Sequence, residues 1–309
     1  MGLALVTGCA GFIGSHLTEK LLEQNWNVFG LDNFHPYYDK RLKIDNLSNF
    51  LHHKNFQFIE GSILSENDLS SLDFDCIFHL AAIAGVRNSM KHPEEYFELN
   101  TNGTEKLLKK FNDVKKFIHA SSSSVYGNLS KDETPVNENH PLNPISPYGE
   151  SKKRAEEICL KFSKTHKTRV SVLRFYTVYG PRQRPDEAIT KFIRLALKGS
   201  PIPIYDKGGK IRDFTFVSDI VNGIILAEKF GDGVYNLGSG RPITVNEMVS
   251  TIEKNMNTKI QKQYLDSPPG DVEITHADIS KAEKELNYKP QTNFEDGIKA
   301  SINWCKSLL

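Results

Sequence analysis

The chain has 309 residues, enough to bury a large core and to form one large domain with a smaller lobe, or two domains. Its composition, 39% hydrophobic and 25% charged, is that of an ordinary globular protein. The formal net charge of +1, without a basic block, argues against a nucleic-acid partner, and no apolar run reaches the ~18 residues of a membrane-spanning helix.

The N-terminus and the cysteines both indicate a cytoplasmic protein. Met1 and Gly2 lead directly into an apolar run, without the basic segment and cleavage site of a secretory signal. The cysteines are widely spaced and form no Cys-x-x-Cys: Cys9, Cys76, Cys159 and Cys305. We therefore expect reduced, mostly buried thiols and no metal site.

A glycine-rich turn joins the first predicted strand, at 3–7, to an amphipathic helix. Its pattern, Gly8-x-x-Gly11-x-x-Gly14, differs from the Gly-x-Gly-x-x-Gly of many dehydrogenases. Such glycines allow a tight turn and close approach of a pyrophosphate, which then lies on the helix N-terminus. The arrangement predicts a dinucleotide site, the alternative being a glycine turn without a ligand.

The second predicted strand, at 28–31, ends at Asp32. An acidic residue at this place suits a ribose 2′-hydroxyl and repels a 2′-phosphate, which favours NAD over NADP. A surface aspartate in a turn is the alternative. The polar and aromatic loop 33–41 follows, and Lys43 is expected to reach the adenosine side.

Four more predicted strands, at 56–59, 75–80, 115–120 and 169–175, alternate with helices at 94–111 and 148–164. This alternation predicts an α/β fold with a Rossmann-like, doubly wound parallel sheet. Small residues after the strand at 75–80 leave room for a flat ring at the ligand-binding edge of the sheet. His79, inside that strand, is interpreted as a packed core histidine.

The strand at 115–120 leads into four serines, Ser121 to Ser124. At the carboxyl end of a strand these hydroxyls could hold a reacting sugar hydroxyl. The alternative is a serine-rich loop that makes local hydrogen bonds to its own backbone.

Pro147 favours a helix start, which places Tyr148 and Lys152 at i and i+4 on one helix face. A nearby ammonium favours the phenolate form of a tyrosine, and a cationic nicotinamide would add to this effect. The pair predicts a base that works near neutral pH, the alternative being a solvated helix start.

Beyond residue 177 the regular alternation weakens, which suggests a second lobe. We expect residues 1–177, with 212–237 returning to them, to form the NAD-binding domain. Residues 178–211 and 238–309 are expected to form the smaller C-terminal α/β lobe, with a helix at 189–197 and a turn at 268–272 before the last helices.

Together these motifs resemble the extended short-chain dehydrogenase/reductases, specifically their nucleotide-sugar epimerases and dehydratases. The matching motifs are Gly8-x-x-Gly11-x-x-Gly14, Asp32-Asn33, His79-Leu80-Ala81-Ala82, Asn100-x-x-Gly103-Thr104, Ser121-Ser122-x-x-Val125-Tyr126-Gly127, Tyr148-x-x-x-Lys152, Arg174-Phe175, Tyr179-Gly180-Pro181, Arg212-Asp213-Phe214 and Asn236-Leu237-Gly238. The resemblance covers nearly the whole chain and implies an enzyme that holds NAD tightly and reuses it.

The resemblance implies three catalytic residues. Tyr148 would take the proton of a sugar hydroxyl while its carbon gives a hydride to NAD. Lys152 would lower the pKa of Tyr148 and hold the nicotinamide ribose, and Ser122 would share the proton network. The implied cofactor-binding residues are Gly8, Gly11, Phe12, Ile13, Gly14, Asp32, Asn33, Lys43, Ser62, Ile63, Leu80, Ala81, Ala82, Asn100, Tyr148, Lys152 and Tyr176.

The step that follows oxidation is indicated by Ser123 and Ser124. Dehydratases of this group place Asp and Glu at these two positions, and the similar decarboxylases place Glu at the second. Because neither serine is an acid or base near neutral pH, elimination is disfavoured and a 4-epimerase is expected.

Within the group the chain is most similar to UDP-glucuronate 4-epimerases, on residues 175–186, 84–87 and 32–39. The serines and Thr177 could accept a sugar carboxylate. Arg212 would bind the diphosphate, Pro203 and Tyr205 would flank the uracil, and Asp271 would bond a ribose hydroxyl. The full set of implied substrate-binding residues is Arg87, Ser122, Ser123, Ser124, Tyr148, Thr177, Arg184, Pro203, Tyr205, Arg212 and Asp271.

Two positions depart from the family pattern. Ser62 stands where an Asp often contacts adenine, and the second diphosphate arginine near residue 268 is absent, which leaves Arg87 or Arg184 to replace it. UDP-glucose or UDP-N-acetylglucosamine 4-epimerase, UDP-glucuronate decarboxylase and a non-catalytic NAD-binding protein remain alternatives.

The resemblance also implies a homodimer without a membrane or nucleic-acid partner. Helices 94–111 and 148–164 would form a four-helix bundle that buries Ile158, Cys159 and Phe162.

Overall fold

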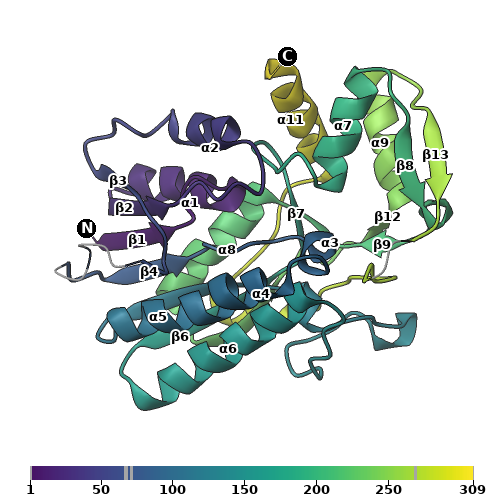
Figure 1. Ribbon diagram of the computed structural model, residues 1–309. Coiled ribbons are helices and arrows are strands. Elements are labelled where there is room, and N and C mark those ends of the chain that lie inside the picture. The colour runs from purple at the N-terminus through teal and green to yellow at the C-terminus, as the bar shows by residue number, and fades with distance from the viewer. Residues whose placement is uncertain (1, 66–68, 70–71, 268–269, 309) are drawn as a thin grey trace.

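The structure is a computed structural model that describes residues 2–65, 69, 72–267 and 270–308. Its centre is a parallel sheet whose strand order is β11-β6-β5-β4-β1-β2-β3 (Figure 1). The strands are β1 (Leu3–Thr7), β2 (Asn27–Asp32), β3 (Phe56–Glu60), β4 (Cys76–His79), β5 (Lys116–Ser122), β6 (Arg169–Phe175) and β11 (Gly233–Leu237).

The order of the strands reverses between β1 and β4, which lie side by side although β2 and β3 separate them in the chain. In doubly wound sheets, ligands bind outside the carboxyl ends of the strands at such a reversal. The predicted fold class is confirmed, and β5 continues to Ser122, beyond its predicted end at residue 120.

Side chains that alternate along the strands pack into two separate cores, as expected for a sheet covered on both faces. Ala4 and Val6 of β1 pack with helices α1 (Phe12–Glu23) and α8 (Val217–Phe230). Leu5, between them, packs on the opposite face with α5 (Gly103–Lys110) and α6 (Pro147–Thr165). Figure 1 shows α5 and α6 together on the side of the sheet away from α1.

The helix predicted at 94–111 is present with an interruption in its hydrogen-bond pattern. It consists of α4 (Pro93–Tyr96), a π-helical segment η2 (Phe97–Asn102) and α5, while α3 (Val86–Ser89) precedes it. A π segment takes one extra residue into a helical turn and often occurs at functional sites. The remaining short elements around the sheet are α2 (Lys40–Leu47), η3 (Ser123–Val125) and η4 (Lys131–Glu133).

A second core lies beside the sheet domain, around the fully buried Tyr179. It is built from α7 (Ala188–Leu197), β8 (Ile202–Tyr205), α9 (Val245–Met256), β13 (Lys262–Leu265) and α11 (Phe294–Ser307). Small strand pairs and a 3-10 turn connect it to the sheet domain: β7 (Thr177–Tyr179) with β10 (Phe214–Phe216), β9 (Ile211–Arg212) with β12 (Ile243–Thr244), and η5 (Asp206–Gly208).

One C-terminal helix packs on the sheet domain and not on the smaller core. Ala282 and Leu286 of α10 (Ser280–Leu286) belong to the core that α8 forms with the sheet, although the predicted boundary assigns this segment to the lobe. The predicted turn at 268–272 begins with two residues outside the described ranges.

His79 is a core histidine, as predicted. It is buried between Thr7 and Thr104, whose hydroxyls lie 2.8 Å from Nδ1 and 2.9 Å from Nε2. Burial lowers the pKa of His79 to about 3, so the ring is neutral.

The cysteines are free and buried, and no helix in the described ranges is long and apolar enough to cross a membrane. The expectation for Cys159 needs a correction. Its side chain is fully buried within the single chain, in the core between α5, α6 and the sheet. Cys159 therefore has no surface left to bury in a dimer, whereas Ile158 and Phe162 are partly exposed.

The contact between α11 and Tyr179 makes a testable prediction about stability. Alanine normally stabilises a helix relative to glycine by ~1 kcal/mol. A Cβ at Gly297, however, would lie 2.2 Å from the Tyr179 hydroxyl. We expect Gly297→Ala to lower the free energy of unfolding by ~1–3 kcal/mol through overpacking, measured by urea denaturation.

Gly209→Ala is the matched control, because the Cβ would meet nothing closer than 3.8 Å. Its free energy of unfolding should stay within ~0.5 kcal/mol of wild type. A Gly297→Ala protein more stable than wild type would contradict this packing.

Candidate active site

The start of α6 positions the candidate catalytic residues. Ser146 caps the helix by accepting a hydrogen bond from Gly149 N at 3.1 Å, and Pro147 occupies the first turn, where its missing N–H costs nothing. Tyr148 and Lys152 follow on the face that meets the end of β5. There the Lys152 ammonium donates to the Ala120 carbonyl at 2.7 Å, and the Ser122 hydroxyl lies near Tyr148 and acts to lower the pKa of its phenol.

The electrostatics of this pair differ from the prediction. Burial raises the pKa of the Tyr148 phenol above its ordinary value, and the Ser122 hydroxyl partly offsets this. The Lys152 ammonium donates its hydrogen bond to the Ala120 carbonyl at 2.7 Å, so its positive charge acts on the phenol through space. Burial also lowers the pKa of Lys152 to about 8, so the ammonium is charged at neutral pH.

The four serines at the end of β5 have different surroundings. Ser122 donates to the Ser124 hydroxyl and accepts from the Ser124 N–H, both at 3.2 Å, which is the local bonding of the alternative interpretation. Ser121 donates to Glu156, a buried carboxylate of α6. All of them, with Ser123, nevertheless line one cavity.

Two cavities, of about 210 and about 460 Å³, meet at this point. Tyr148, Ser121 and Arg184 line both of them. The smaller cavity runs along the ends of β1, β2 and β4, and the larger lies between the sheet domain and the second core. A group in one cavity can therefore react with a group in the other beside the Tyr148 hydroxyl.

The glycine turn shapes the floor of the smaller cavity. Gly8 has a φ of +75°, and a Cβ there would lie 2.8 Å from the Ala81 nitrogen. A Cβ on Gly14 would lie 2.0 Å from the Gly8 carbonyl oxygen, so α1 packs against the turn at a distance that only glycine allows. The bare backbone at the N-terminus of α1 fits the diphosphate of a dinucleotide.

Asp32 ties this turn to the end of β2. Its carboxylate accepts hydrogen bonds from Ala10 N at 3.1 Å and Phe34 N at 2.8 Å. Burial raises the pKa of Asp32 above its ordinary value, and the nearby Lys43 ammonium counteracts this. The carboxylate lies at the cavity edge, where a ribose hydroxyl would find a strong acceptor.

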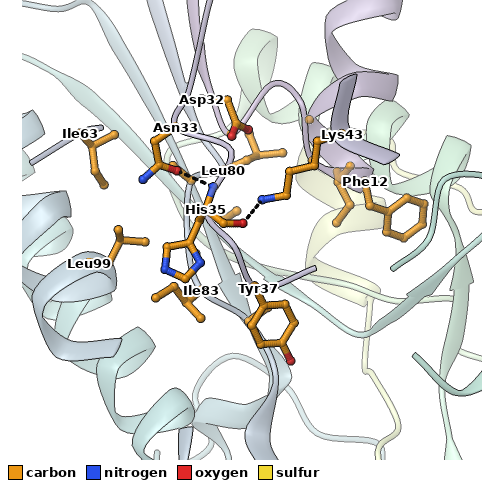
Figure 2. A pocket seen from close by; sticks show the side chains of 18 of the residues that line it. Phe12, Asp32, Asn33, His35, Tyr37, Lys43, Ile63, Leu80, Ile83 and Leu99 are labelled. Carbon is orange, nitrogen blue, oxygen red and sulfur yellow. Dashed lines mark hydrogen bonds between the residues drawn. The ribbon is translucent and has the colours of Figure 1, made fainter. Parts of the chain in front are cut away.

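The loop after Asp32 forms another wall of the cavity, shown in Figure 2. Lys43 donates to the His35 carbonyl at 2.7 Å and lies over the Tyr38 ring. His35 Nδ1 and the Tyr38 hydroxyl are buried without a hydrogen-bond partner in the described part of the chain. Because buried polar atoms are normally paired, these two fit a polar cofactor in the cavity.

The predicted cofactor residues line the smaller cavity with two exceptions. Asn100 supports its wall from behind, since its side chain bonds both the N–H and the carbonyl of Ile83, at 2.8 and 3.0 Å. Tyr176 lies on the larger cavity instead, because β6 ends at Phe175 and the chain turns toward the second core.

Every residue predicted to bind substrate lines the larger cavity. Most cations there have carboxylate partners. Arg184 pairs with Asp186 at 3.0 Å and Glu187 at 2.6 Å, and Arg212 pairs with Asp271 at 2.7 Å. Arg87 lies over the Tyr205 ring, 4.7 Å from its centroid.

Sequence reasoning missed four charged residues of this cavity: Asp186, Glu187, Lys191 and Lys210. Glu187 and Lys191 lie at the start of α7, one helical turn apart. Lys210, buried beside Asp271, lies two residues before Arg212 on the same extended segment. A spacing of four places Glu187 and Lys191 on one side of α7, and a spacing of two places Lys210 and Arg212 on one side of the extended segment around β9. These spacings could have identified the missed residues once Arg184 and Arg212 were candidates.

No cluster of three or more potential metal ligands occurs in residues 2–65, 69, 72–267 and 270–308.

The chain matches known proteins along almost its full length. Residues 5–301 match the family model described as GDP-mannose 4,6 dehydratase. A UDP-glucuronate 4-epimerase from Thermodesulfobacterium geofontis is 39% identical, over 99% of this chain and 97% of that protein.

Solved structures agree with this similarity. A UDP-glucuronic acid 4-epimerase from Bacillus cereus, crystallised with UDP-glucuronic acid and NAD, superposes with a TM-score of 0.95 at 38% identity, covering 99% of this chain and 100% of that one. A UDP-glucose 4-epimerase from Thermotoga maritima, crystallised with UDP-glucose, has a TM-score of 0.91 at 32% identity, with 99% of each chain covered.

The glycine turn makes a prediction about cofactor binding. Gly14→Ala should weaken NAD binding strongly, because the added Cβ forces the turn and α1 apart where the diphosphate would lie. The measurement is the dissociation constant of NAD by calorimetry on cofactor-stripped protein.

Gly61→Ala is the control in the same cavity, since its Cβ would make an ordinary contact of 3.4 Å with Leu31. It should bind NAD like wild type. Equal NAD affinity in Gly14→Ala and wild type would exclude this turn as the diphosphate site.

Proposed function

The chain belongs to the GDP-mannose 4,6-dehydratase-like family of extended short-chain dehydrogenase/reductases, and we propose that it is an NAD-dependent 4-epimerase of UDP-glucuronate. The observation that carries this proposal is the position of Tyr148, with Lys152 and Ser122, where the two cavities meet. The product is UDP-galacturonate, formed through a transient 4-keto sugar.

The smaller cavity is proposed to hold NAD, which when bound supplies a hydride acceptor that can return the hydride. Gly8, Gly11 and Gly14 leave space for its diphosphate, and Asp32 accepts from a ribose hydroxyl. His35 and Tyr38 line the same space, and each has a buried polar atom without a hydrogen-bond partner in the described part of the chain.

Tyr148 is the proton carrier in this proposal. Its phenol is protonated in the structure, since burial raises its pKa. The positive charge of Lys152 stabilises the phenolate, and a bound cationic nicotinamide would lower the pKa further. The phenolate then takes the proton of the sugar 4-hydroxyl, and the nearby Ser122 hydroxyl helps to lower the pKa of the phenol.

Epimerisation is favoured over elimination because the serines offer no acid or base to the sugar. The carboxylates that do line the larger cavity are already engaged. Glu187 and Asp186 both pair with Arg184, at 2.6 and 3.0 Å. A hydroxyl leaving group therefore has no free acid beside Ser123 and Ser124 in the described site.

The sugar carboxylate needs to be held out of alignment with the 4-keto group. A β-keto acid loses CO₂ when its carboxylate bond aligns with the ketone π system. Ser123, Ser124 and Thr177 line the cavity as neutral hydrogen-bond donors that can fix the carboxylate in another orientation. This is the reason for preferring a uronate over a neutral sugar.

We further propose a cytoplasmic homodimer that forms through α6 and the helical run from α4 to α5. The helices are adjacent on one face of the molecule, and Arg154 of α6 lies over the Phe97 ring of η2 at 4.8 Å. The partly exposed Ile158 and Phe162 supply apolar surface on the same helix.

The function is tested by turnover of UDP-glucuronate in wild type and Tyr148→Phe. The variant should lose ~10²–10⁴-fold in kcat, because it cannot take the hydroxyl proton, while its bound NAD is unchanged. Chromatography of the UDP-sugars gives the rate, and the absorbance of released cofactor gives the NAD content.

Tyr264→Phe, an exposed tyrosine on β13, is the control and should keep full activity. Turnover that survives in Tyr148→Phe would refute the proton assignment. Conversion of UDP-glucose but not UDP-glucuronate would refute the choice of substrate.

A further inference from the structure

Three consecutive residues at the end of β5 contact three residues of α6 that are spaced four apart. The Ala120 carbonyl accepts from Lys152, the Ser121 hydroxyl donates to Glu156, and the Ser122 hydroxyl lies near Tyr148 and acts on its pKa. Tyr148, Lys152 and Glu156 form one stripe on the helix, as their spacing requires. The two catalytic members thus have a third partner on the same stripe.

Glu156 is fixed much more firmly than a solvated carboxylate would be. It is 1% exposed. Arg174 of β6 donates hydrogen bonds to both of its carboxylate oxygens, from Nε at 3.1 and 3.2 Å and from Nη2 at 2.7 Å. Arg174 Nη1 in turn donates to the Tyr126 hydroxyl at 2.9 Å and the Glu138 carbonyl at 3.1 Å. The carboxylate is therefore anchored to β5, β6 and the loop after η3 together.

We infer that Glu156 is a positioning residue for the catalytic pair, which holds the Tyr148–Lys152–Glu156 stripe in register with the end of β5 through Ser121 and Arg174. This inference rests on the proposed function, in which Tyr148 and Lys152 act on the sugar hydroxyl. Glu156 itself touches neither cavity. Its effect reaches the substrate through the positions of Lys152 and Ser122.

Glu156 also affects the charge of Lys152. The charged or titratable groups that face this ammonium are Glu156 and Cys159 on α6, His79 on β4 and His119 on β5. The two histidines are neutral because burial lowers their pKa values, so they add no charge there. Cys159 stays a thiol because burial raises its pKa, which leaves Glu156 as the facing carboxylate that favours the ammonium in the described site.

The sign of the pH effect follows from this arrangement. Lys152, with a pKa of about 8, is charged below that pH and loses its charge above it. Because the Glu156 carboxylate raises that pKa, removing its charge should make Lys152 lose its proton at a lower pH. The alkaline fall of kcat should then begin at a lower pH as well.

The test compares Glu156→Gln with Glu157→Gln in the NAD-bound enzyme, using UDP-glucuronate as substrate. Glu157 is the neighbouring exposed carboxylate of α6. We expect Glu156→Gln to lower kcat by about a hundredfold with KM little changed, since a misplaced catalytic group costs about this much. Its alkaline limb should move to lower pH, while Glu157→Gln keeps both the rate and the pH profile of wild type.

A second variant, Ser121→Ala, covers the possibility that Glu156→Gln, which leaves Arg174 unpaired, does not fold. It keeps the Glu156–Arg174 ion pair and removes the hydrogen bond that links Glu156 to β5. We expect a lower kcat with an unchanged KM and an unshifted alkaline limb, because the carboxylate charge remains. A folded variant of either kind with wild-type kcat and pH profile would overturn the inference, even if its melting temperature fell.

If wild type does not convert UDP-glucuronate, the proposed function fails but the positioning role can still be judged. The readout is then the pH titration of the Lys152 ammonium by NMR of lysine-labelled protein, taken as the difference from the matching Lys152→Gln protein. The midpoint should lie at lower pH in Glu156→Gln than in Glu157→Gln, because the Glu156 carboxylate no longer favours the ammonium. Equal midpoints would overturn the inference.

Discussion

The buried Lys152 ammonium at the carboxyl end of β5 is the constraint on which the site depends. A charge that is 3% exposed needs partners, and here the Ala120 carbonyl accepts a hydrogen bond from the ammonium at 2.7 Å. This hydrogen bond fixes α6 against the strand end and brings the Tyr148 hydroxyl to the junction of the two cavities. The carboxyl-end location follows from the sheet, since its strand order reverses between β1 and β4.

The site then separates two tasks between its cavities. The smaller one has bare backbone at the glycine turn, a carboxylate at Asp32 and unpaired polar atoms on His35 and Tyr38, which suit a dinucleotide. The larger one contains paired charges and neutral hydroxyls. Because Glu187 and Asp186 are both ion-paired with Arg184, the sugar beside Tyr148 meets few free acids or bases other than the catalytic pair. That environment suits oxidation and reduction at one carbon.

Sequence alone predicted the features that local signals encode. The glycine spacing predicted the turn, Pro147 predicted the start of α6 to within one residue, and alternating strands and helices predicted the sheet. It failed where the outcome depended on contacts between distant segments. The pKa of Tyr148 is raised because the folded chain buries it, and Lys152 turns to Ala120, which no i, i+4 spacing reveals. Glu187 and Lys210 entered the site for the same reason, through the packing of the second core on the sheet domain.

The central claim is a redox cycle at the sugar C4 that leaves the carboxylate in place. Its most direct test is NMR analysis of the product formed from UDP-glucuronate that carries deuterium at C4. The account predicts UDP-galacturonate with the deuterium still at C4, because the hydride removed from this carbon returns to it on the other face. A UDP-pentose would show that Ser123, Ser124 and Thr177 do not protect the carboxylate. Loss of the deuterium from C4 would contradict a cycle in which the same hydride is taken and returned.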